Sequence, residues 1–130
     1  MVIDTSALLA ILQGEPERRA LIDAIQNAES CLLSTATLVE TSIVIEARYG
    51  VEGGRDLDLF LKRAGFEFVP VDVEQAEIAR RGFNRYGRRR HRAALNFGDC
   101  FAYALAISLG ESLLFKGDGF RHTDVQPHEA

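Results

Sequence analysis

The sequence predicts an α/β fold: a three-layer α/β/α domain with a central, mainly parallel sheet of four to five strands. Short apolar stretches that suit buried strands alternate with longer stretches of helical periodicity along the chain. Neither an internal repeat nor a low-complexity linker interrupts this alternation. Such alternation is typical of a parallel sheet covered by helices on both faces. Because 130 residues suffice for one real core, we expect a single domain over residues 1–130.

The first unit is a strand followed directly by a helix. Met1, Val2 and Ile3 are apolar and include two β-branched residues, which suits a buried strand. The next residues, 4–6, are Asp, Thr and Ser, which are preferred at helix N-caps, and residues 7–12 are strong helix formers. An acid therefore lies at the strand end, where α/β sheets bind ligands. A cap alone would also explain Asp4.

The middle of the chain continues the alternation. Pro16 fits the first turn of a second helix, and residues 30–33 suit a second short buried strand. A helix over 35–49 is closed by Gly50, because glycine is favoured just past helix C-termini. Glycines 53 and 54 are expected to precede another helix over 56–64, and residues 67–71 form a third strand.

The last part of the chain contains two more helices. Asp72 caps a helix that runs into an arginine-rich stretch, which we expect to be a helix end and a loop. A helix over 100–109 begins at Asn96–Asp99 and stops at Gly110. A fourth strand over 112–115, a loop over 116–119 and a short edge strand at 124–126 complete the expected elements.

Composition excludes several classes of protein. Hydrophobic residues make up 47% and charged residues 26%, as in ordinary globular chains. No apolar run approaches the ~18 residues that span a bilayer. No basic segment precedes an apolar one, so we expect no signal peptide, no membrane partner and a cytoplasmic location. Cys31 and Cys100 lack metal or disulfide spacing and are expected to be buried free thiols.

Positive charge is concentrated in one stretch. Seven arginines and His91 lie between Arg80 and Arg92 with no acid among them, leaving 8 basic against 19 acidic residues elsewhere. Arginine outnumbers lysine 13 to 2, which favours bidentate contact with phosphate. The stretch therefore indicates an anionic partner, or else a solvated helix end and loop.

Three further acids occupy unusual positions. Glu40 falls inside an apolar arc of its helix, where a carboxylate needs a cation, hydrogen bonds or a proton. A Thr37–Glu40 capping box is the alternative. Asp99 has capping-box spacing to Asn96, and small residues at 102 and 106 leave room above it. Asp118 follows a strand within Gly-Asp-Gly, which is also good turn chemistry.

If the strands are parallel, these acids and Asp4 approach one rim of the sheet. Clustered carboxylates repel one another, and hard divalent cations relieve the repulsion. All-oxygen ligation favours Mg²⁺ or Mn²⁺, which can activate water at a phosphoryl centre. Thr5 and Ser6 are expected to hold a metal-bound water or to orient Asp4.

Four features in this order, residues 2–8, Glu40, residues 96–106 and residues 113–120, resemble the PIN-domain family. The resemblance is closest to VapC-type toxins of bacterial toxin–antitoxin pairs and extends from Val2 to about Gln126. It implies a metal-dependent endoribonuclease toxin, held inactive by a VapB-type antitoxin that covers the acidic groove. It also implies a toxin homodimer and a higher toxin–antitoxin assembly. The chain departs from the family at Gly119, often a second acid, and at Lys116, often Thr or Ser.

The resemblance carries site roles onto matching residues. Asp4, Glu40, Asp99 and Asp118 match the family's catalytic acids. We expect Asp4 and Asp99 to hold Mg²⁺, with Mn²⁺ able to substitute, while Glu40 and Asp118 bind a second ion or orient the attacking water. Asn96, like Thr5 and Ser6, would support these ligands. The residues expected to bind RNA phosphates are Arg85, Arg88, Arg89, Arg90, Arg92 and Lys116.

Rival interpretations fit less well. A haloacid-dehalogenase phosphatase needs a second Asp where Ser6 stands, and a receiver domain needs paired acids and a proline where Gly117 stands. The chain has no Walker loop, no GxGxxG and no zinc-ligand spacing, and its three histidines are expected at the surface. A non-catalytic RNA-binding or adaptor module whose acids are only caps, or another Mg²⁺-dependent phosphohydrolase, stays open.

Overall fold

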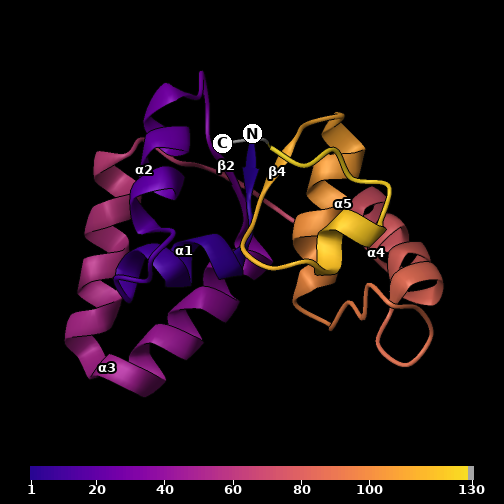
Figure 1. Ribbon diagram of the computed structural model, residues 1–130, viewed down its shortest axis with the longest axis horizontal. Coiled ribbons are helices and arrows are strands. Elements are labelled where there is room, and N and C mark those ends of the chain that lie inside the picture. Colours follow the sequence, from indigo (N-terminus) through magenta and orange to yellow (C-terminus); the bar gives the residue numbers. More distant parts are fainter. Residues whose placement is uncertain (129–130) are drawn as a thin grey trace.

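The computed structural model describes residues 1–128 and contains a four-stranded sheet in the order β3-β2-β1-β4 (Figure 1). The central strand β1 (Val2–Ile3) pairs in parallel with β2 (Leu32–Ser34) and β4 (Leu113–Leu114). The edge strand β3 (Glu67–Val69) pairs in parallel with β2. The predicted parallel α/β sheet is thus confirmed, with all carboxyl ends of its strands at one edge.

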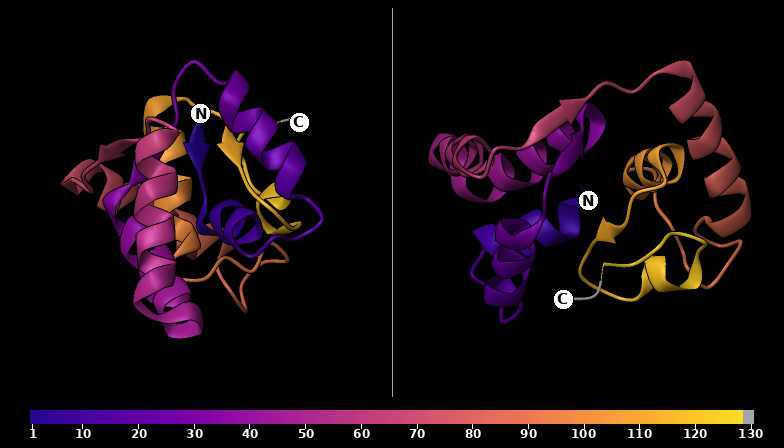
Figure 2. Two further views of the ribbon diagram at one scale, coloured as in Figure 1. Left: turned by 90° about the vertical axis from the view of Figure 1, so that its left-hand side faces the viewer. Right: turned by 90° about the horizontal axis from the view of Figure 1, so that it is seen from above.

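Helices cover both faces of this sheet. One layer contains α1 (Thr5–Leu12), α2 (Arg18–Asn27) and α3 (Thr35–Arg63). The other contains α4 (Val73–Tyr86), α5 (Asp99–Leu109) and the short 3₁₀ helix η1 (Gly119–His122). Figures 1 and 2 show the strands between these two groups, which confirms the three-layer architecture.

The strands divide the core into two parts. Val2, Leu32 and Leu113 pack with α4 and α5, whereas the next residue of each strand packs with α1, α2 and α3. This division follows from strand geometry, because successive side chains point to opposite faces. Both faces are apolar, so the short strands read as continuous hydrophobic runs.

Helix α3 corrects one predicted boundary. The chain turns at Gly50, where φ is 69°, as expected for a helix stop. Helical structure resumes at once, however, and Gly53 and Gly54 lie buried inside α3 rather than before a helix. A Cβ at Gly53 would lie 2.8 Å from both Ile45 Cγ2 and Tyr49 Cβ, so this glycine permits close packing across the kink.

The end of the chain corrects another expectation. Residues 124–126 form no strand; a single isolated bridge joins Leu113 to Pro127. The backbone N–H of Leu113 donates to the Gln126 carbonyl (2.9 Å), and that of His128 donates to the Leu113 carbonyl (2.9 Å). Because β4 has only two residues, the neighbouring chain has too little edge to continue as a strand.

Two expectations about the rest of the chain are confirmed. The arginine-rich stretch consists of the end of α4 and a loop closed by a bridge between Gly87 and Leu95. Cys31 and Cys100 are buried free thiols. Within residues 1–128, no helix combines the length and apolarity that a membrane crossing requires.

Candidate active site

Asp4 lies at the carboxyl end of β1 and caps α1. Its Oδ2 accepts a hydrogen bond from the backbone N–H of Ser6 (3.0 Å). Its side chain is buried, and Oδ1 has no hydrogen-bond partner among the described residues. An unpartnered buried carboxylate oxygen is costly, so this atom calls for a cation or a proton. Asp4 therefore caps α1 through Oδ2, while Oδ1 remains available for a cation or a proton.

Electrostatics at Asp4 reflect neighbouring acids as well as burial. Burial is the main cause that raises the pKa of Asp4 to about 7, although hydrogen bonds from Ser6 oppose the shift. The negative charges of Asp99 and Glu40 raise this pKa further. Three acids from distant parts of the chain therefore lie within electrostatic reach of one another.

Glu40 is held by the hydroxyl of Thr5, which donates to Oε1 at 2.6 Å. The Thr41 hydroxyl lies 3.1 Å from Thr5 Oγ1 and 2.8 Å from the Thr37 carbonyl. On the other side, the Glu40 carboxylate lies so close to Gly98 that a Cβ there would overlap it. Glu40 is thus fixed between the start of α1 and the turn before α5.

The predicted alternative for Glu40, a capping box with Thr37, is wrong. The N-cap of α3 is Ser34, whose hydroxyl accepts from the backbone N–H of Ala36 at 3.2 Å. The helix therefore begins three residues before a Thr37 cap would allow. Glu40 lies in the second turn, where its side chain is free to face the other acids.

Asp99 begins α5 and makes the reciprocal bonds expected for its spacing to Asn96. The Asp99 N–H donates to Asn96 Oδ1, and the Asn96 N–H donates to Asp99 Oδ2, both at 2.9 Å. Burial is the main cause that raises the pKa of Asp99, and the charge of Glu40 adds to it. The bond from Asn96 and the charge of Arg88 act in the opposite direction.

Asp118 occupies a different setting from the other three acids. It precedes η1 and is exposed, and within residues 1–128 its side chain makes no hydrogen bond with Asp4, Glu40 or Asp99. At the next position, a Cβ on Gly119 would lie 2.9 Å from the Ala93 carbonyl oxygen. A second acid there would require the backbone to shift.

The chemistry of the gathered acids suits a hard divalent ion. Within residues 1–128, no three His, Cys, Asp or Glu side chains are already close enough to enclose a metal. The donors are nevertheless all oxygens, and Oδ1 of Asp4 is buried without a partner. Oxygen donors with incomplete hydrogen bonding fit Mg²⁺ or Mn²⁺.

Comparison with known proteins identifies the family. The family model for the PIN domain matches residues 1–126. The chain belongs to the PIN-domain family. Within it, the "Ribonuclease VapC" of Mycolicibacterium smegmatis is 56% identical over 125 residues, which cover 96% of this chain and 97% of that protein. This PIN domain is therefore a VapC-type ribonuclease by family, as the sequence resemblance implied.

Solved structures support the same fold. One of them is Mycobacterium tuberculosis VapC20, described as a Sarcin-Ricin loop cleaving toxin. It superposes with a TM-score of 0.73 at 19% sequence identity, and the match covers 97% of this chain and 98% of the VapC20 chain. A chain of a toxin–antitoxin complex from Klebsiella pneumoniae gives a TM-score of 0.72 at 17% identity, covering 99% and 98%. At these identities the likeness concerns the fold.

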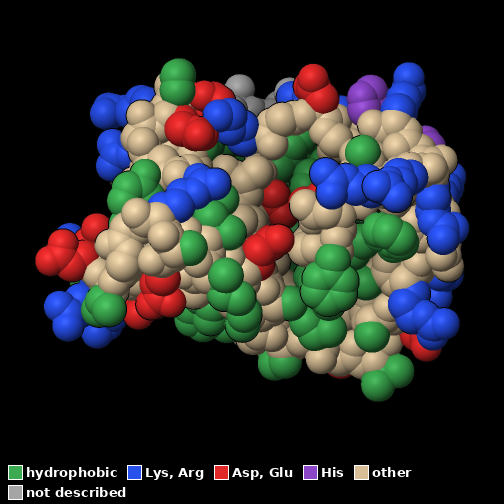
Figure 3. Space-filling model, turned by 90° about the horizontal axis from the view of Figure 1, so that it is seen from below, with side chains coloured by type: hydrophobic (Ala, Val, Ile, Leu, Met, Phe, Trp, Pro, Cys, Tyr) green, Lys and Arg blue, Asp and Glu red, His purple; other side chains and the backbone are tan. Residues whose placement is uncertain are grey.

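A basic surface lies beside the acids of the PIN domain. Its members are exposed and come from the end of α4 and the loop that follows: Arg85, Arg88, Arg89, Arg90 and Arg92. Figure 3 shows acidic side chains in a hollow between the two halves of the molecule, with Lys and Arg side chains gathered along one side. The Arg90 guanidinium lies over the Phe83 ring (5.8 Å to its centroid), so aromatic side chains support this surface.

Lys116 is paired within the molecule. Its ammonium lies 2.7 Å from Glu15 Oε2 and 3.2 Å from Glu17 Oε2, in the segment between α1 and α2. Its backbone N–H donates to Ser6 Oγ at 3.0 Å. Ser6 therefore links the end of β4 to the cap of α1, and contact of Lys116 with phosphate would compete with two carboxylates.

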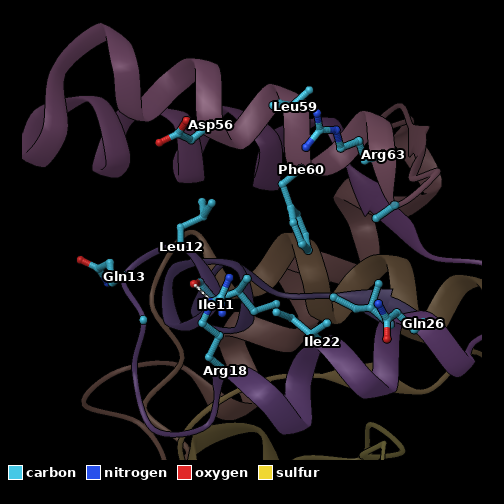
Figure 4. Close-up of a pocket in the computed structure, with 13 residues that line it drawn as sticks. Ile11, Leu12, Gln13, Arg18, Ile22, Gln26, Asp56, Leu59, Phe60 and Arg63 are labelled. Carbon is cyan, nitrogen blue, oxygen red and sulfur yellow. Dashed lines mark hydrogen bonds between the residues drawn. The ribbon is translucent and has the colours of Figure 1, made fainter.

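A groove that the sequence did not indicate lies on the opposite layer. It has a volume of about 860 Å³ and separates α1 and α2 from the second half of α3 (Figure 4). Its floor includes Ile11, Ile22 and Phe60, and Arg18 and Arg63 lie at its edges. The sequence gives no sign of it, because it forms only where α3 folds back after Gly50.

Proposed function

We propose that this protein is a metal-dependent endoribonuclease that acts as the toxin of a toxin–antitoxin pair. The observation that carries the proposal is the buried Oδ1 of Asp4, without a partner, next to Glu40 and Asp99. A purely structural cap would not need two further acids beside it. Ribonuclease relatives of matching length support the choice of RNA as the substrate.

Asp4 and Asp99 would hold Mg²⁺, for which Mn²⁺ could substitute. Such an ion, when bound, polarises a phosphoryl oxygen and makes water a stronger nucleophile. Glu40, oriented by Thr5, would accept a proton from the attacking water. The water oxygen would then bond to phosphorus while the bond from phosphorus to the leaving ribose oxygen breaks, and that oxygen would take up a proton from solvent. Asp118 would act from its exposed position as a ligand of a second ion.

RNA would be gripped by the basic surface beside the acids. Contacts between arginine and phosphate carry no sequence information. These arginines would therefore hold the RNA backbone across the hollow without selecting a base sequence. We also propose that the protein works in the cytoplasm, where its free cysteines remain reduced and RNA is accessible.

Cleavage of a single-stranded RNA tests the catalytic assignment. We expect Asp4→Asn and Asp99→Asn each to lower the rate by roughly a hundredfold or more, and EDTA to abolish cleavage until Mg²⁺ is restored. Asp58→Asn, a change to an exposed acid of α3, is the matched control and should cleave normally. Cleavage that persists unchanged in EDTA would refute the metal-dependent reaction.

We further propose that the antitoxin binds the groove between α1, α2 and α3 through an amphipathic helix. The floor of the groove is apolar. Of the three charged residues that line it, Arg18 and Arg63 are basic and Asp56 is acidic, so the balance favours acidic residues flanking the apolar face of that helix. The structural neighbour described as a toxin–antitoxin complex supports an antitoxin partner. The homodimer implied by the resemblance stays a prediction.

Co-expression with the cognate antitoxin tests this docking site. Leu59 lines the groove and is half exposed, so Leu59→Glu should reduce the antitoxin recovered with the chain without unfolding it. Leu109→Glu makes the same change at a similarly exposed position at the end of α5 and should retain the antitoxin. Equal recovery with both variants would exclude the groove.

A further inference from the structure

Phe97 is the most unusual apolar side chain near the acids. It lies two residues before Asp99, and 78% of it is exposed to solvent. The turn that carries it is fixed by the two reciprocal hydrogen bonds between Asn96 and Asp99. The position of Phe97 relative to Asp99 is therefore built into the site, and exposure of its ring is not the result of a loose loop.

A neighbouring aromatic residue props the ring from one side. The rings of Phe97 and Phe101 meet edge to face, with centroids 5.0 Å apart and an interplanar angle of 80°. With this much of Phe97 exposed, a large part of its π surface stays open. Phe101 therefore packs against one side of the Phe97 ring, and a planar group can stack on its exposed surface.

The ring also borders a groove of about 400 Å³ between α4 and α5. Apart from the stem and guanidinium of Arg80, its lining is apolar: Ala76, Ala79, Phe83, Phe97, Cys100 and Phe101. A volume of this order lies within the range of small-molecule sites and would accept a planar base.

Positive charge surrounds this aromatic surface. Arg80 lines the groove itself, and the guanidinium of Arg90 lies over the Phe83 ring. Arg88 is near enough to Asp99 for its positive charge to lower the pKa of that acid. Aromatic rings set among arginines are typical of proteins that bind single-stranded nucleic acid, since bases stack on the rings while arginines hold the phosphates. A second copy of this chain is the alternative occupant of this surface, and the molecular mass in solution distinguishes the two.

We propose that Phe97 stacks against a base of single-stranded RNA that flanks the phosphate to be cleaved. This inference rests on the proposed function and adds a subsite to it. Stacking on a ring at a fixed distance from Asp99 would align the neighbouring phosphate with the acids. It would also favour single-stranded RNA, because the faces of bases inside a duplex are covered by the neighbouring base pairs.

Fluorescence of 2-aminopurine tests the subsite directly, because stacking quenches this base analogue. The probes are short unstructured RNA oligomers with 2-aminopurine at successive positions, bound to Asp4→Asn protein so that they are not cut. We expect one position to be quenched when Phe97 is present. Phe97→Leu in the same background keeps an apolar side chain but removes the π face, and it should abolish the quenching and weaken binding roughly five- to 150-fold.

Two further variants sharpen the test. Phe97→Trp restores a larger π face and should restore quenching. Phe68→Leu, the same change at a half-exposed phenylalanine of β3, should leave quenching and affinity as they are in the parent protein. The molecular mass in solution should be the same for the Phe97 variants and the parent.

The outcomes separate this inference from the proposed function. Equal quenching and affinity with phenylalanine and leucine would overturn the subsite, even while the native protein still cleaves RNA. A lower mass for Phe97→Leu with unchanged RNA affinity per chain would assign Phe97 to contact between two copies instead. Failure of the native protein to cleave any RNA in Mg²⁺ would remove the proposed function itself.

Discussion

Asp4 carries a carboxyl group that the fold buries without giving both oxygens a partner. Because the pKa of Asp4 is raised to about 7, the folded protein holds a proton there that the unfolded chain releases near its ordinary value of 3.8. Between these values the folded state binds more protons, so the free energy of unfolding falls as pH rises. Above pH 7 this contribution levels off.

This sign gives a prediction for the metal-free protein. We expect stability to fall from about pH 4 to about pH 7, by an amount on the order of 4 kcal/mol if the other groups are unchanged. Asp4→Asn, which cannot titrate, should flatten the profile over that interval. Urea unfolding in EDTA at a series of pH values measures both proteins, and parallel profiles would contradict the burial of a protonated Asp4.

Thr5 links α1 to the proposed proton acceptor Glu40. We expect Thr5→Val, which has nearly the same shape, to lower the cleavage rate about 10- to 100-fold, because Glu40 loses its donor. Thr5→Ser keeps the hydroxyl and should recover most of the rate. Steady-state cleavage, with circular dichroism as the check on folding, measures both; equal losses for Val and Ser would contradict a specific role of the Thr5 hydroxyl.

Some residues of the site could be predicted from sequence and others could not. Asp4, Asp99 and Asn96 stand in cap patterns, whose residue types and spacings are informative. The apolar arc predicted around Glu40 is not a buried face, because Val39 and Ile43 are exposed. Thr41 has no such pattern; its hydroxyl matters only because α1 packs on α3. The pairing of Lys116 with Glu15 and Glu17 likewise depends on how the chain folds back.

Among the helices, α4 and α5 approach closely at Gly82. A Cβ at this buried glycine would lie 2.6 Å from Cε1 of Tyr103, whose hydroxyl is held by Asp124 at 2.7 Å. The ring cannot turn away without losing that bond. Close contact between these helices thus depends on the absence of a side chain at residue 82.

We therefore expect Gly82→Ala to destabilise the protein by about 1–3 kcal/mol, although alanine is the better helix former. Urea unfolding of the variant and the native protein measures the difference. Asn84→Ala, at an exposed position of α4, supplies the control and should have little effect. A more stable Gly82→Ala protein would mean that α4 can move outward at little cost.

The boundaries of α3 could be predicted from the sequence only in part. Gly50 ends a helical segment as predicted, since its positive φ is a local property. Gly53 and Gly54 look like another break, yet they are helical because two parts of α3 need to approach each other. The alternation of strands and helices was sufficient for the parallel sheet, whereas a residue's role in close packing requires coordinates.

On the face shown in Figure 3, a hollow between the two halves of the molecule contains acidic side chains, and Lys and Arg side chains lie along one side of it. We expect replacement of Arg88, Arg89 and Arg90 by Gln to weaken RNA binding and to lower the slope of log affinity against log salt by about 0.7 per lost phosphate contact. Fluorescence anisotropy over a salt series measures the slope. Replacing Arg19, Arg55 and Arg63 instead is the charge-matched control, and an equal loss in both would show only an effect of net charge.

Calorimetric titration of Mn²⁺ into the metal-free protein above pH 7 tests most directly whether the acids form a metal centre. The structure predicts saturable binding by the native protein, severe loss of binding in Asp4→Asn and Asp99→Asn, and native binding in Asp58→Asn. Identical isotherms for the native protein and Asp4→Asn, or no binding by either, would contradict the metal centre and the reaction built on it.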